Sequence, residues 1–493
     1  MNPVQSIEYL LNPSSIAVVG ASTNRNKHGG RLIHHLLMHG YTGKIYPINP
    51  KADNIQGLTC FPSIKALPES VDLACLLISS KYLLKTMEEC VDKKIKMVMI
   101  HSSGFAETGR EGAKLQQQLV EYAKANGIRI CGPNTIGITN VKNKVFASFS
   151  MSMTSTNIPV DGSISYITQS GAIGGAMLSQ GWDKSIGINK WISSGNEADL
   201  DAADYIDYMV KDDSTRTICV FLEGIKDGLK LKRSLVKAAN KRKPVIVFKN
   251  GRTEVGRKSV QSHTGLLAGN HKVYQAVFKQ YGVIMAESLD DLFDFAMALN
   301  YLSLPDGKRV GVVSTSGGAC TIVADRCIDS GLEVPDLTKE SKERLKAILP
   351  DFGAPQNPFD TTAQILNNPE YLKQGLEVLI NDPNIDAMIL MLTILAGSVA
   401  THVAEDIIEL SQLSDKPIIV AWTIAENLAK EGMNKLRKAK VPLYPSPERA
   451  VKSLQVMQQY KRFLEEWERK KEVYNVALLK NVPVVDYSIH SKH

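Results

Sequence analysis

Long hydrophobic runs, paired cysteines and blocks of like charge are all missing from this sequence of 493 residues. No stretch approaches the roughly 18 consecutive apolar residues of a membrane span. The N-terminus also lacks the basic start and long apolar core of a signal peptide. The sequence therefore predicts a cytoplasmic protein that does not cross a membrane.

Cysteine is scarce and irregularly spaced. The sequence contains no Cys-x-x-Cys pair and no Cys/His zinc pattern. The seven cysteines are Cys60, Cys75, Cys90, Cys131, Cys219, Cys320 and Cys327. Several of them stand within apolar runs, as is typical of reduced, packed thiols in the cytosol. We expect neither disulfides nor a bound metal.

Charge is spread along the chain. The 58 basic and 51 acidic residues give a net charge of +7, and no five like charges stand together. This distribution argues against a nucleic-acid-binding arm, while a mild positive bias would still help to attract an anionic substrate. A hydrophobic content of 44% is ordinary for a globular protein.

Three times the chain passes from a short apolar strand through a Gly/Ser turn into a helical pattern. The three turns are Gly20-Ala21-Ser22, Gln169-Ser170-Gly171-Ala172 and Ser314-Thr315-Ser316-Gly317-Gly318. Short apolar strands that alternate with helices indicate parallel sheets covered on both faces. Because Thr168-Gln169-Ser170-Gly171 parallels Thr315-Ser316-Gly317-Gly318, we expect an α/β protein in which one flavodoxin-like domain is duplicated.

Breaks in periodicity divide the chain. Proline, glycine and short polar residues interrupt the pattern around residues 150–161 and 303–307. We therefore predict domains over residues 1–150, 151–302 and 303–460. A charged tail over residues 461–493 follows, and we expect a solvated helix or interface element in its first part.

Three turns of the first domain favour an elongated phosphorylated ligand. Gly20-Ala21-Ser22 follows a strand and suits phosphate binding at a helix start, although it is not the Gly-x-Gly-x-x-Gly of a nicotinamide site. The second strand ends at Lys51 instead of an acidic residue that would bind ribose. Two further turns, Ser103-Gly104-Phe105 and Gly132-Pro133-Asn134, follow strands at the same predicted sheet edge.

The second domain combines a histidine, a carboxylate and a helix start. The turn Ser170-Gly171-Ala172 offers a helix N-terminus to an anion, and Glu223 ends a strand at the same edge. His263 lies among small residues in the run over residues 261–269, ahead of a helix expected over residues 273–281. Because Gly251, Gly256, Gly265 and Gly269 bracket it, we expect a flexible loop there. A carboxylate on one imidazole nitrogen would leave the other as a nucleophile, although a surface salt bridge explains Glu223 equally well.

From residue 7 to residue 463 the chain closely resembles the α subunit of NDP-forming acyl-CoA synthetases, the ADP-forming acetyl-CoA synthetase type within the succinyl-CoA synthetase superfamily. The resemblance rests on nine motifs in order: Val18-Val19-Gly20-Ala21-Ser22, Ile48-Asn49-Pro50-Lys51, Ser103-Gly104-Phe105-Ala106-Glu107, Gly132-Pro133-Asn134, Gln169-Ser170-Gly171-Ala172, Ser194-Gly195-Asn196, Glu223-Gly224, Ser262-His263-Thr264-Gly265 and Asn357-Pro358-Phe359-Asp360. It implies a Rossmann-like CoA-binding domain followed by two flavodoxin-like domains of the succinyl-CoA synthetase type.

The resemblance also implies a role for each candidate residue. Coenzyme A would bind with its phosphates near Gly20, Ala21, Ser22 and Lys51, and with its pantetheine arm near Ser103, Gly104, Phe105 and Asn134. His263 would be transiently phosphorylated and Glu223 would hold it. Ser170, Gly171 and Ala172 would receive the phosphoryl group.

The implied enzyme is an acid–thiol ligase that interconverts acyl-CoA, ADP and phosphate with carboxylate, ATP and CoA. Two departures from the family stand out. The nucleotide-binding ATP-grasp domain is missing, so a separate β subunit, expected in an α2β2 heterotetramer, would supply Mg²⁺-nucleotide binding. Thr135 stands where relatives often have cysteine, so the acyl pocket need not be the same.

Two other functions compete with this interpretation. A regulatory protein could sense CoA or acyl-CoA without catalysis, although His263 and Glu223 are both present. A nicotinamide-dependent oxidoreductase would fit the first domain alone, but the missing glycine motif and Lys51 disfavour it.

Overall fold

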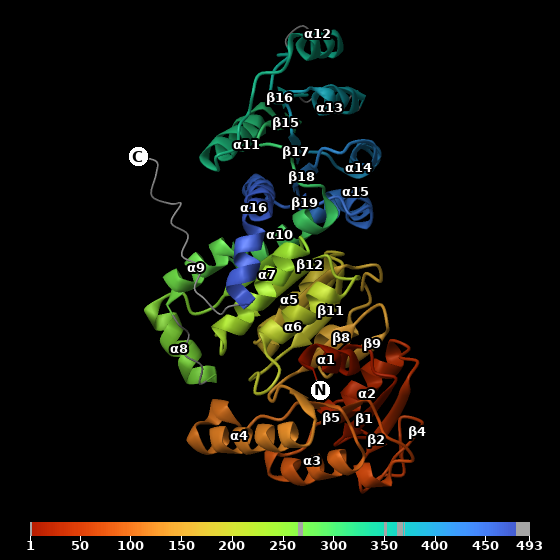
Figure 1. Ribbon diagram of the computed structural model, residues 1–493. Helices are drawn as coiled ribbons and strands as arrows, with labels where there is room; N and C mark the ends of the chain where they lie inside the picture. Colours follow the sequence, from red (N-terminus) through yellow and green to blue (C-terminus); the bar gives the residue numbers. More distant parts are fainter. Residues whose placement is uncertain (1, 265–269, 350–352, 362–367, 369, 480–493) are drawn as a thin grey trace. The chain divides into compact units, whose positions relative to one another are not determined.

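The computed structural model describes residues 2–264, 270–349, 353–361, 368 and 370–479 (Figure 1). The chain divides into two compact units, one made of the residues up to 289 together with those from 469 on, the other of residues 290–468. The larger unit holds a parallel sheet, a mixed sheet and a two-stranded hairpin, and the smaller unit holds a second parallel sheet. The predicted α/β class is confirmed.

The first sheet has five parallel strands in the order β2-β1-β5-β6-β7. They are β1 (Ser15–Val19), β2 (Lys44–Ile48), β5 (Leu73–Leu76), β6 (Met97–Ile100) and β7 (Arg129–Cys131). Every residue of β1, β5 and β6 is buried, as expected for apolar strands covered on both faces.

Helices and one small hairpin complete the first domain. The helices are α1 (Pro3–Leu11), α2 (His28–Met38), α3 (Leu83–Asp92), α4 (Arg110–Ala125) and the 3₁₀ turns η1 (Ile64–Ala66), η2 (Ser80–Tyr82) and η3 (Ala106–Thr108). The hairpin pairs β3 (Asn54–Ile55) with β4 (Leu58–Thr59).

The second sheet has the order β14-β13-β12-β10-β11-β8-β9. Its parallel strands are β10 (Ile164–Thr168), β11 (Ile188–Ser193), β12 (Thr217–Leu222), β13 (Val245–Lys249) and β14 (Ile284–Ala286). The hairpin of β8 (Gly137–Asn140) and β9 (Val145–Ser148) pairs with β11 in antiparallel fashion. The predicted domain boundary near residue 150 thus falls just after a hairpin that hydrogen-bonds in the second sheet.

The helices of this domain include one that the sequence did not predict. They are η4 (Met151–Thr154), α5 (Gly171–Asp183), α6 (Ala202–Lys211), α7 (Gly228–Asn240), α8 (Glu254–Thr264), α9 (His271–Gln280) and, at the unit boundary, α10 (Leu289–Tyr301). The expected helix over residues 273–281 is α9. The prediction of a flexible loop around His263 is wrong for residues 254–264, because these residues form α8. The sequence of α8 is mostly polar and has no broad apolar stripe, so it gave no helical signal.

The third sheet repeats the topology of the second. Its order β16-β15-β17-β18-β19 corresponds to β11-β10-β12-β13-β14, and all its strands are parallel. The strands are β15 (Val310–Ser314), β16 (Phe359–Asp360), β17 (Ala387–Thr393), β18 (Ile418–Thr423) and β19 (Leu443–Tyr444). Thr168 is the last residue of β10 and Ser314 is the last residue of β15, and the next helix begins three residues later in both domains. Thr168 therefore corresponds to Ser314, and the predicted match of Thr168 with Thr315 is wrong by one residue.

The helices of the third domain end in a long segment. They are α11 (Gly317–Asp329), α12 (Lys339–Ile348), α13 (Glu370–Asn381), α14 (Gly397–Leu413), α15 (Glu426–Lys438) and α16 (Pro447–Leu479). The predicted charged tail therefore begins inside α16, and residues 480–493 lie outside the described part of the chain.

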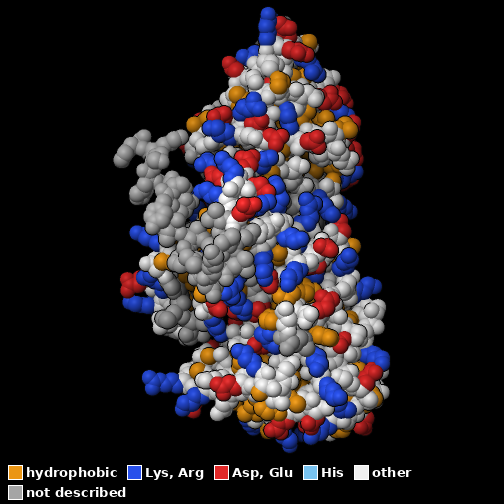
Figure 2. All heavy atoms as spheres, viewed as in Figure 1, with side chains coloured by type: hydrophobic (Ala, Val, Ile, Leu, Met, Phe, Trp, Pro, Cys, Tyr) orange, Lys and Arg blue, Asp and Glu red, His pale blue; other side chains and the backbone are white. Residues whose placement is uncertain are grey.

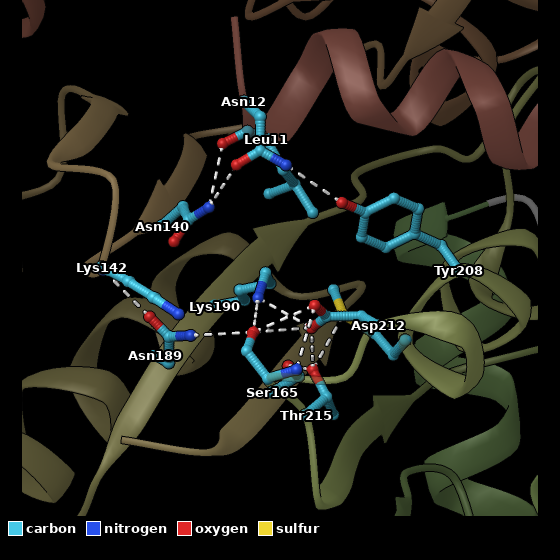
Figure 3. Close-up of polar contacts among 12 residues, drawn as sticks. Leu11, Asn12, Asn140, Lys142, Ser165, Asn189, Lys190, Tyr208, Asp212 and Thr215 are labelled. Atoms are coloured by element: carbon cyan, nitrogen blue, oxygen red, sulfur yellow. Dashed lines mark hydrogen bonds and ion pairs between the residues drawn. The ribbon is translucent and has the colours of Figure 1, made fainter. Parts of the chain in front are cut away.

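A polar network anchors α1 to the second sheet (Figure 3). The amide of Asn140, at the end of β8, donates to Leu11 O at 3.2 Å and to Asn12 Oδ1 at 2.7 Å. Asn12 donates to the hydroxyl of Tyr208, on α6, at 3.2 Å. Lower in the view, buried Lys190 donates to Asp212 at 2.7 Å. The end of α1 is therefore hydrogen-bonded to both a strand and a helix of the second domain.

The surface mixes charges of both signs. On the face drawn in Figure 2, lysine and arginine are interspersed with aspartate and glutamate, as the sequence predicts. None of the helices in the described part of the chain combines the length and the hydrophobicity that a membrane-spanning segment needs.

Candidate active site

The turn after β1 requires glycine. Gly20 has φ +86°, and a Cβ there would lie 2.4 Å from the carbonyl oxygen of Leu77. The N–H groups of Gly20 and Ala21 both donate to Ile48 O, at 3.1 and 3.3 Å. These two donors face the sheet, so a phosphate at this turn would be bound by Ser22 and the start of α2.

A cavity of about 430 Å³ lies against this turn. Its walls include Gly20, Ala21, Ser22, Lys27, Asn49, Pro50, Ser63 and Tyr82. Lys27, the residue before α2, was missed by the sequence analysis, although the basic pair Arg25 and Lys27 between the glycine turn and a helix is a usable signal.

Lys51 lies beside the cavity wall and is exposed. Its N–H donates to Asn49 Oδ1 at 2.9 Å, and the amide of Asn49 donates to Ala21 O at 2.8 Å. Asn49 therefore ties the turn that carries Lys51 to the glycine turn, and the two predicted phosphate-binding turns are neighbours.

The turn after β6 is organised by a carboxylate. Gly104 has φ +103°, and its N–H donates to Glu107 Oε1 at 2.6 Å, as does the N–H of Phe105 at 3.1 Å. Phe105 is fully buried in the hydrophobic core, so only its backbone can face a ligand. Ser103 is exposed at the tip.

Asn134 lies close to this turn. Its N–H donates to Ser102 O at 3.0 Å, and its backbone is left-handed with φ +60°. The next residue, Thr135, is fully buried and donates to Ser193 O. The departure from cysteine at position 135 therefore changes a packed side chain, and Asn134 remains the ligand-facing candidate in this loop.

A second cavity, of about 470 Å³, opens at the start of α5. Small and hydroxyl-bearing residues dominate its walls, which include Ile136, Ser150, Ser152, Gly171, Ala172 and Gly175. Ser170 is the N-cap of α5, and its side chain makes no capping hydrogen bond. The predicted anion-binding residues Ser170, Gly171 and Ala172 thus lie together at a helix N-terminus beside a small cavity.

Glu223 directly follows β12, the strand that pairs with β10. Its residue is 6% exposed, and its N–H donates to Gln169 Oε1 at 2.5 Å. The topology therefore places Glu223 next to the turn that begins α5, as the sequence predicts for a shared sheet edge.

A buried lysine lies beneath Glu223. Lys249, the last residue of β13, donates to Glu223 O at 2.8 Å and lies 4.9 Å above the ring of Tyr274. Burial lowers the pKa of Lys249 to about 8, and the charge of Glu223 opposes that shift. The sequence analysis missed this residue because a lysine at a strand end gives no periodic signal.

The backbone of His263 lies in the last turn of α8, and its side chain lies outside the described part of the chain. Helix α8 contacts η3, which follows the turn of Gly104 and Phe105. In Figure 1, α8 lies near the end of α4 in the first domain. The helix that carries His263 is therefore a neighbour of the predicted pantetheine turn.

Comparisons with known proteins match every domain. Residues 14–141 match a CoA binding domain, residues 161–299 a succinyl-CoA ligase like flavodoxin domain and residues 310–465 a ligase-CoA domain. The predicted CoA-binding and succinyl-CoA-synthetase-type domains are thereby confirmed.

Whole-chain relatives point the same way. The chain is 35% identical to the α subunit of acetate–CoA ligase [ADP-forming] II of Pyrococcus furiosus, over 90% of this chain and 95% of the relative. It is 36% identical to the α subunit of form I, over 93% of this chain and 98% of the relative.

A solved structure agrees with these relatives. Acetyl-coenzyme A synthetase 1 of Ca. Korarchaeum cryptofilum, in complex with phosphate and ADP, superimposes with a TM-score of 0.84 at 33% identity. The match covers 97% of this chain and 99% of that one. The chain described here belongs to the family of ADP-forming acetate–CoA ligase α subunits.

Proposed function

We propose that this chain is the catalytic α subunit of an ADP-forming acyl-CoA synthetase. The reaction is acyl-CoA + ADP + phosphate ⇌ carboxylate + ATP + CoA. The observation that carries the proposal is convergence: Glu223 lies beside the start of α5, and the helix of His263 contacts the element after the turn of Gly104.

The chemistry runs in three transfers. A phosphate oxygen attacks the thioester carbonyl, the carbon–sulfur bond breaks and the CoA thiolate leaves, which forms an acyl phosphate. An imidazole nitrogen of His263 then attacks phosphorus and releases the carboxylate. An oxygen of the ADP β-phosphate finally takes the phosphoryl group from His263.

The first domain supplies the CoA site. The phosphates of CoA bind at Gly20, Ala21, Ser22 and Lys51. This assignment is supported by the cavity that the first three residues line together with Lys27, and beside which Lys51 lies. The pantetheine arm binds at Ser103, Gly104, the backbone of Phe105 and Asn134. This assignment is supported by the contact of α8, the helix that carries His263, with η3, which follows this turn.

The second domain supplies the transfer site. Ser170, Gly171 and Ala172 bind the phosphoryl group at the positive end of α5. Glu223 holds His263 while it is phosphorylated. The cavity of about 470 Å³ at the start of α5 has room for phosphate and a small carboxylic acid, with acetate as the first candidate.

A partner chain completes the enzyme. We expect an ATP-grasp β subunit that binds Mg²⁺ and ADP or ATP, in an α2β2 heterotetramer. Support comes from the two Pyrococcus relatives, each named as a subunit alpha and each covered almost end to end. We place the complex in the cytoplasm because all seven cysteines are unpaired and buried.

Incubation with acetyl-CoA and ³²P-labelled phosphate tests the function. The chain, purified with its β partner, should acquire an acid-labile, base-stable label. The variant His263→Ala should acquire none while its CoA affinity, measured by calorimetry, stays within about twofold. An unlabelled wild type that still binds CoA would favour the regulatory alternative instead.

A further inference from the structure

The segment after β11, residues 194–200, runs along the CoA-binding domain; we call it the strap. Its backbone N–H groups donate to carbonyls of the loop after β7 and of β7 itself: Asn196 to Pro133 at 2.9 Å, Ala198 to Gly132 at 2.9 Å and, within β7, Leu200 to Ile130 at 3.3 Å. The Arg129 guanidinium contacts Asp199 at 2.7 and 2.9 Å. The strap therefore follows a strand of the second domain and is hydrogen-bonded to the first.

One side chain of the strap holds the pantetheine turn. The amide of Asn196 donates to the Glu107 carboxylate, and to Gln116 Oε1 at 3.1 Å. Glu107 in turn accepts the N–H groups of Gly104 and Phe105. Burial pushes the pKa of Glu107 up, but these donors, Asn196 foremost, hold it below its ordinary value. Asn196 thus supports the carboxylate on which the turn is built.

The next side chain of the strap, that of Glu197, is linked to Glu223 through Gln169. Glu197 is 2% exposed and accepts the Ser194 hydroxyl at 2.7 Å and the Gln169 amide at 2.8 Å. The other end of that amide, Gln169 Oε1, accepts the N–H groups of Glu223 and Gly224 at 2.5 and 3.0 Å. Two hydrogen bonds therefore separate Glu197 from the backbone of the proposed catalytic carboxylate.

The backbone between these two side chains is held rigidly. Glu197 has a left-handed backbone with φ +51°, which a non-glycine residue adopts only when its surroundings require it. Lys226 donates to the carbonyls of both Asn196 and Glu197, at 2.7 and 2.8 Å. A displacement of Asn196 must therefore move Glu197 as well.

We propose that Asn196 and Glu197 are positioning residues that couple the pantetheine turn of the CoA-binding domain to Glu223. The proposal rests on the function proposed above, which assigns the turn and Glu223. Binding of the pantetheine arm shifts Glu107, the strap transmits the shift, and Gln169 changes the setting of the Glu223 backbone. Phosphorylation of His263 thereby becomes faster when CoA or acyl-CoA is present.

Hydrogen–deuterium exchange of the α/β complex, with and without CoA, tests the coupling directly. In the wild type, CoA should slow exchange of the amides of Glu223 and Gly224 at least about fivefold, the lower end of typical coupling between sites. Glu197→Ala and Asn196→Ala should bind CoA within about threefold of wild type and lose that response. Their kcat should fall about tenfold with little change in KM.

Two further variants separate coupling from simple support. Glu197→Gln can accept from Gln169 and donate to Ser194, so it should restore the exchange response. Gln116→Ala removes another partner of Asn196 outside the relay and should leave the response intact. Wild-type complex that binds CoA without any change at Glu223 and Gly224 overturns the coupling alone. Wild-type complex that does not bind CoA overturns the proposed function as well.

Discussion

The second and third domains share one topology but carry different side chains at the sheet edge. Strand pairing places Gln169, Glu223 and Lys249 of the second domain where the third has Thr315, Thr393 and Trp422. The backbone contact survives, because Thr315 Oγ1 accepts the N–H of Thr393 at 3.0 Å, as Gln169 does for Glu223. The titratable groups of the second edge are therefore replaced at matching positions.

The two helix starts differ as well. A Cβ on Gly317, the first residue of α11, would lie 2.9 Å from Asp360 Oδ2, so a carboxylate of the protein already occupies that helix N-terminus. A Cβ on Gly171, the first residue of α5, would meet the side chain of Ile136 at 2.9 Å. The third domain thus neutralises its own anion site, whereas the second presents an apolar wall and a cavity. Chemistry on this fold depends on a few edge residues.

The largest effect on catalysis is expected when Glu223 of the second domain is replaced by threonine, the residue at the matching position 393 of the third domain. Glu223→Thr removes the carboxylate at the edge and should slow phosphorylation of His263 about 100-fold, within the range for loss of one electrostatic catalytic group. Glu223→Gln should be slower than wild type by a smaller factor. Labelling rates with acetyl-CoA and ³²P-phosphate measure both, with CoA affinity unchanged. Equal rates in wild type and variants would remove Glu223 from the mechanism.

The stability of the second domain should also depend on pH near neutrality, through the carboxyl group of Glu197. Burial raises the pKa of Glu197 to about 7 from an ordinary 4.5, so its stabilising contribution is present below about pH 4.5 and is lost as pH rises through 7. The other ionisable groups that surround it are Asp201 and Tyr205 of the α6 region, Lys226 and Cys131.

Glu197→Gln removes this titration. Between pH 5.5 and pH 8 the wild type should lose about 2 kcal/mol of folding free energy relative to Glu197→Gln. Denaturant unfolding at both pH values checks the difference. A gap between the two proteins that stays constant with pH would place the pKa of Glu197 outside this window.

Gln169→Thr gives the second domain the residue that the third domain has at the matching position 315. The new hydroxyl could still accept the N–H of Glu223, as Thr315 does for Thr393, but could not reach Glu197. We expect kcat to fall about tenfold, the weight of one lost buried hydrogen bond, with KM for CoA nearly unchanged. Combining it with Glu197→Ala should add little, and additive losses would separate the two residues.

The reverse test in the third domain should leave catalysis unaffected. Thr315→Val removes the acceptor for the N–H of Thr393 and should cost about 1–2 kcal/mol of folding free energy, as measured by denaturant unfolding. The labelling rate of His263 should not change. A slower rate would give the third domain's edge a part in the reaction.

Continuous apolar strands were predictable from the sequence. The strands expected ahead of the Ser103 turn and at Glu223 are β6 and β12, because each is a short apolar run between polar turns. The edge positions of Glu223 and of Ser170 followed from the same reasoning, since carboxyl ends of parallel strands share one edge.

Other features depend on contacts that sequence spacing does not encode. Helix α8 is rich in polar and small residues, so its helical conformation was missed. The relay from Gln169 to Glu197 joins residues 28 positions apart through the crossover of two strands. Lys27 and Lys249 carry no periodic signal, and their importance arises only from the cavity and the burial around them.

The amide of Gln169 can lie in only one orientation. Its oxygen faces two backbone N–H groups, so its NH₂ must face Glu197. A carboxylate at position 169 would place one of its oxygens against the carboxylate of Glu197. An amide at position 197 would have to turn its NH₂ group away from the NH₂ group of Gln169. Replacements at these two positions are therefore interdependent, and across sequences of this family positions 169 and 197 should covary as a pair.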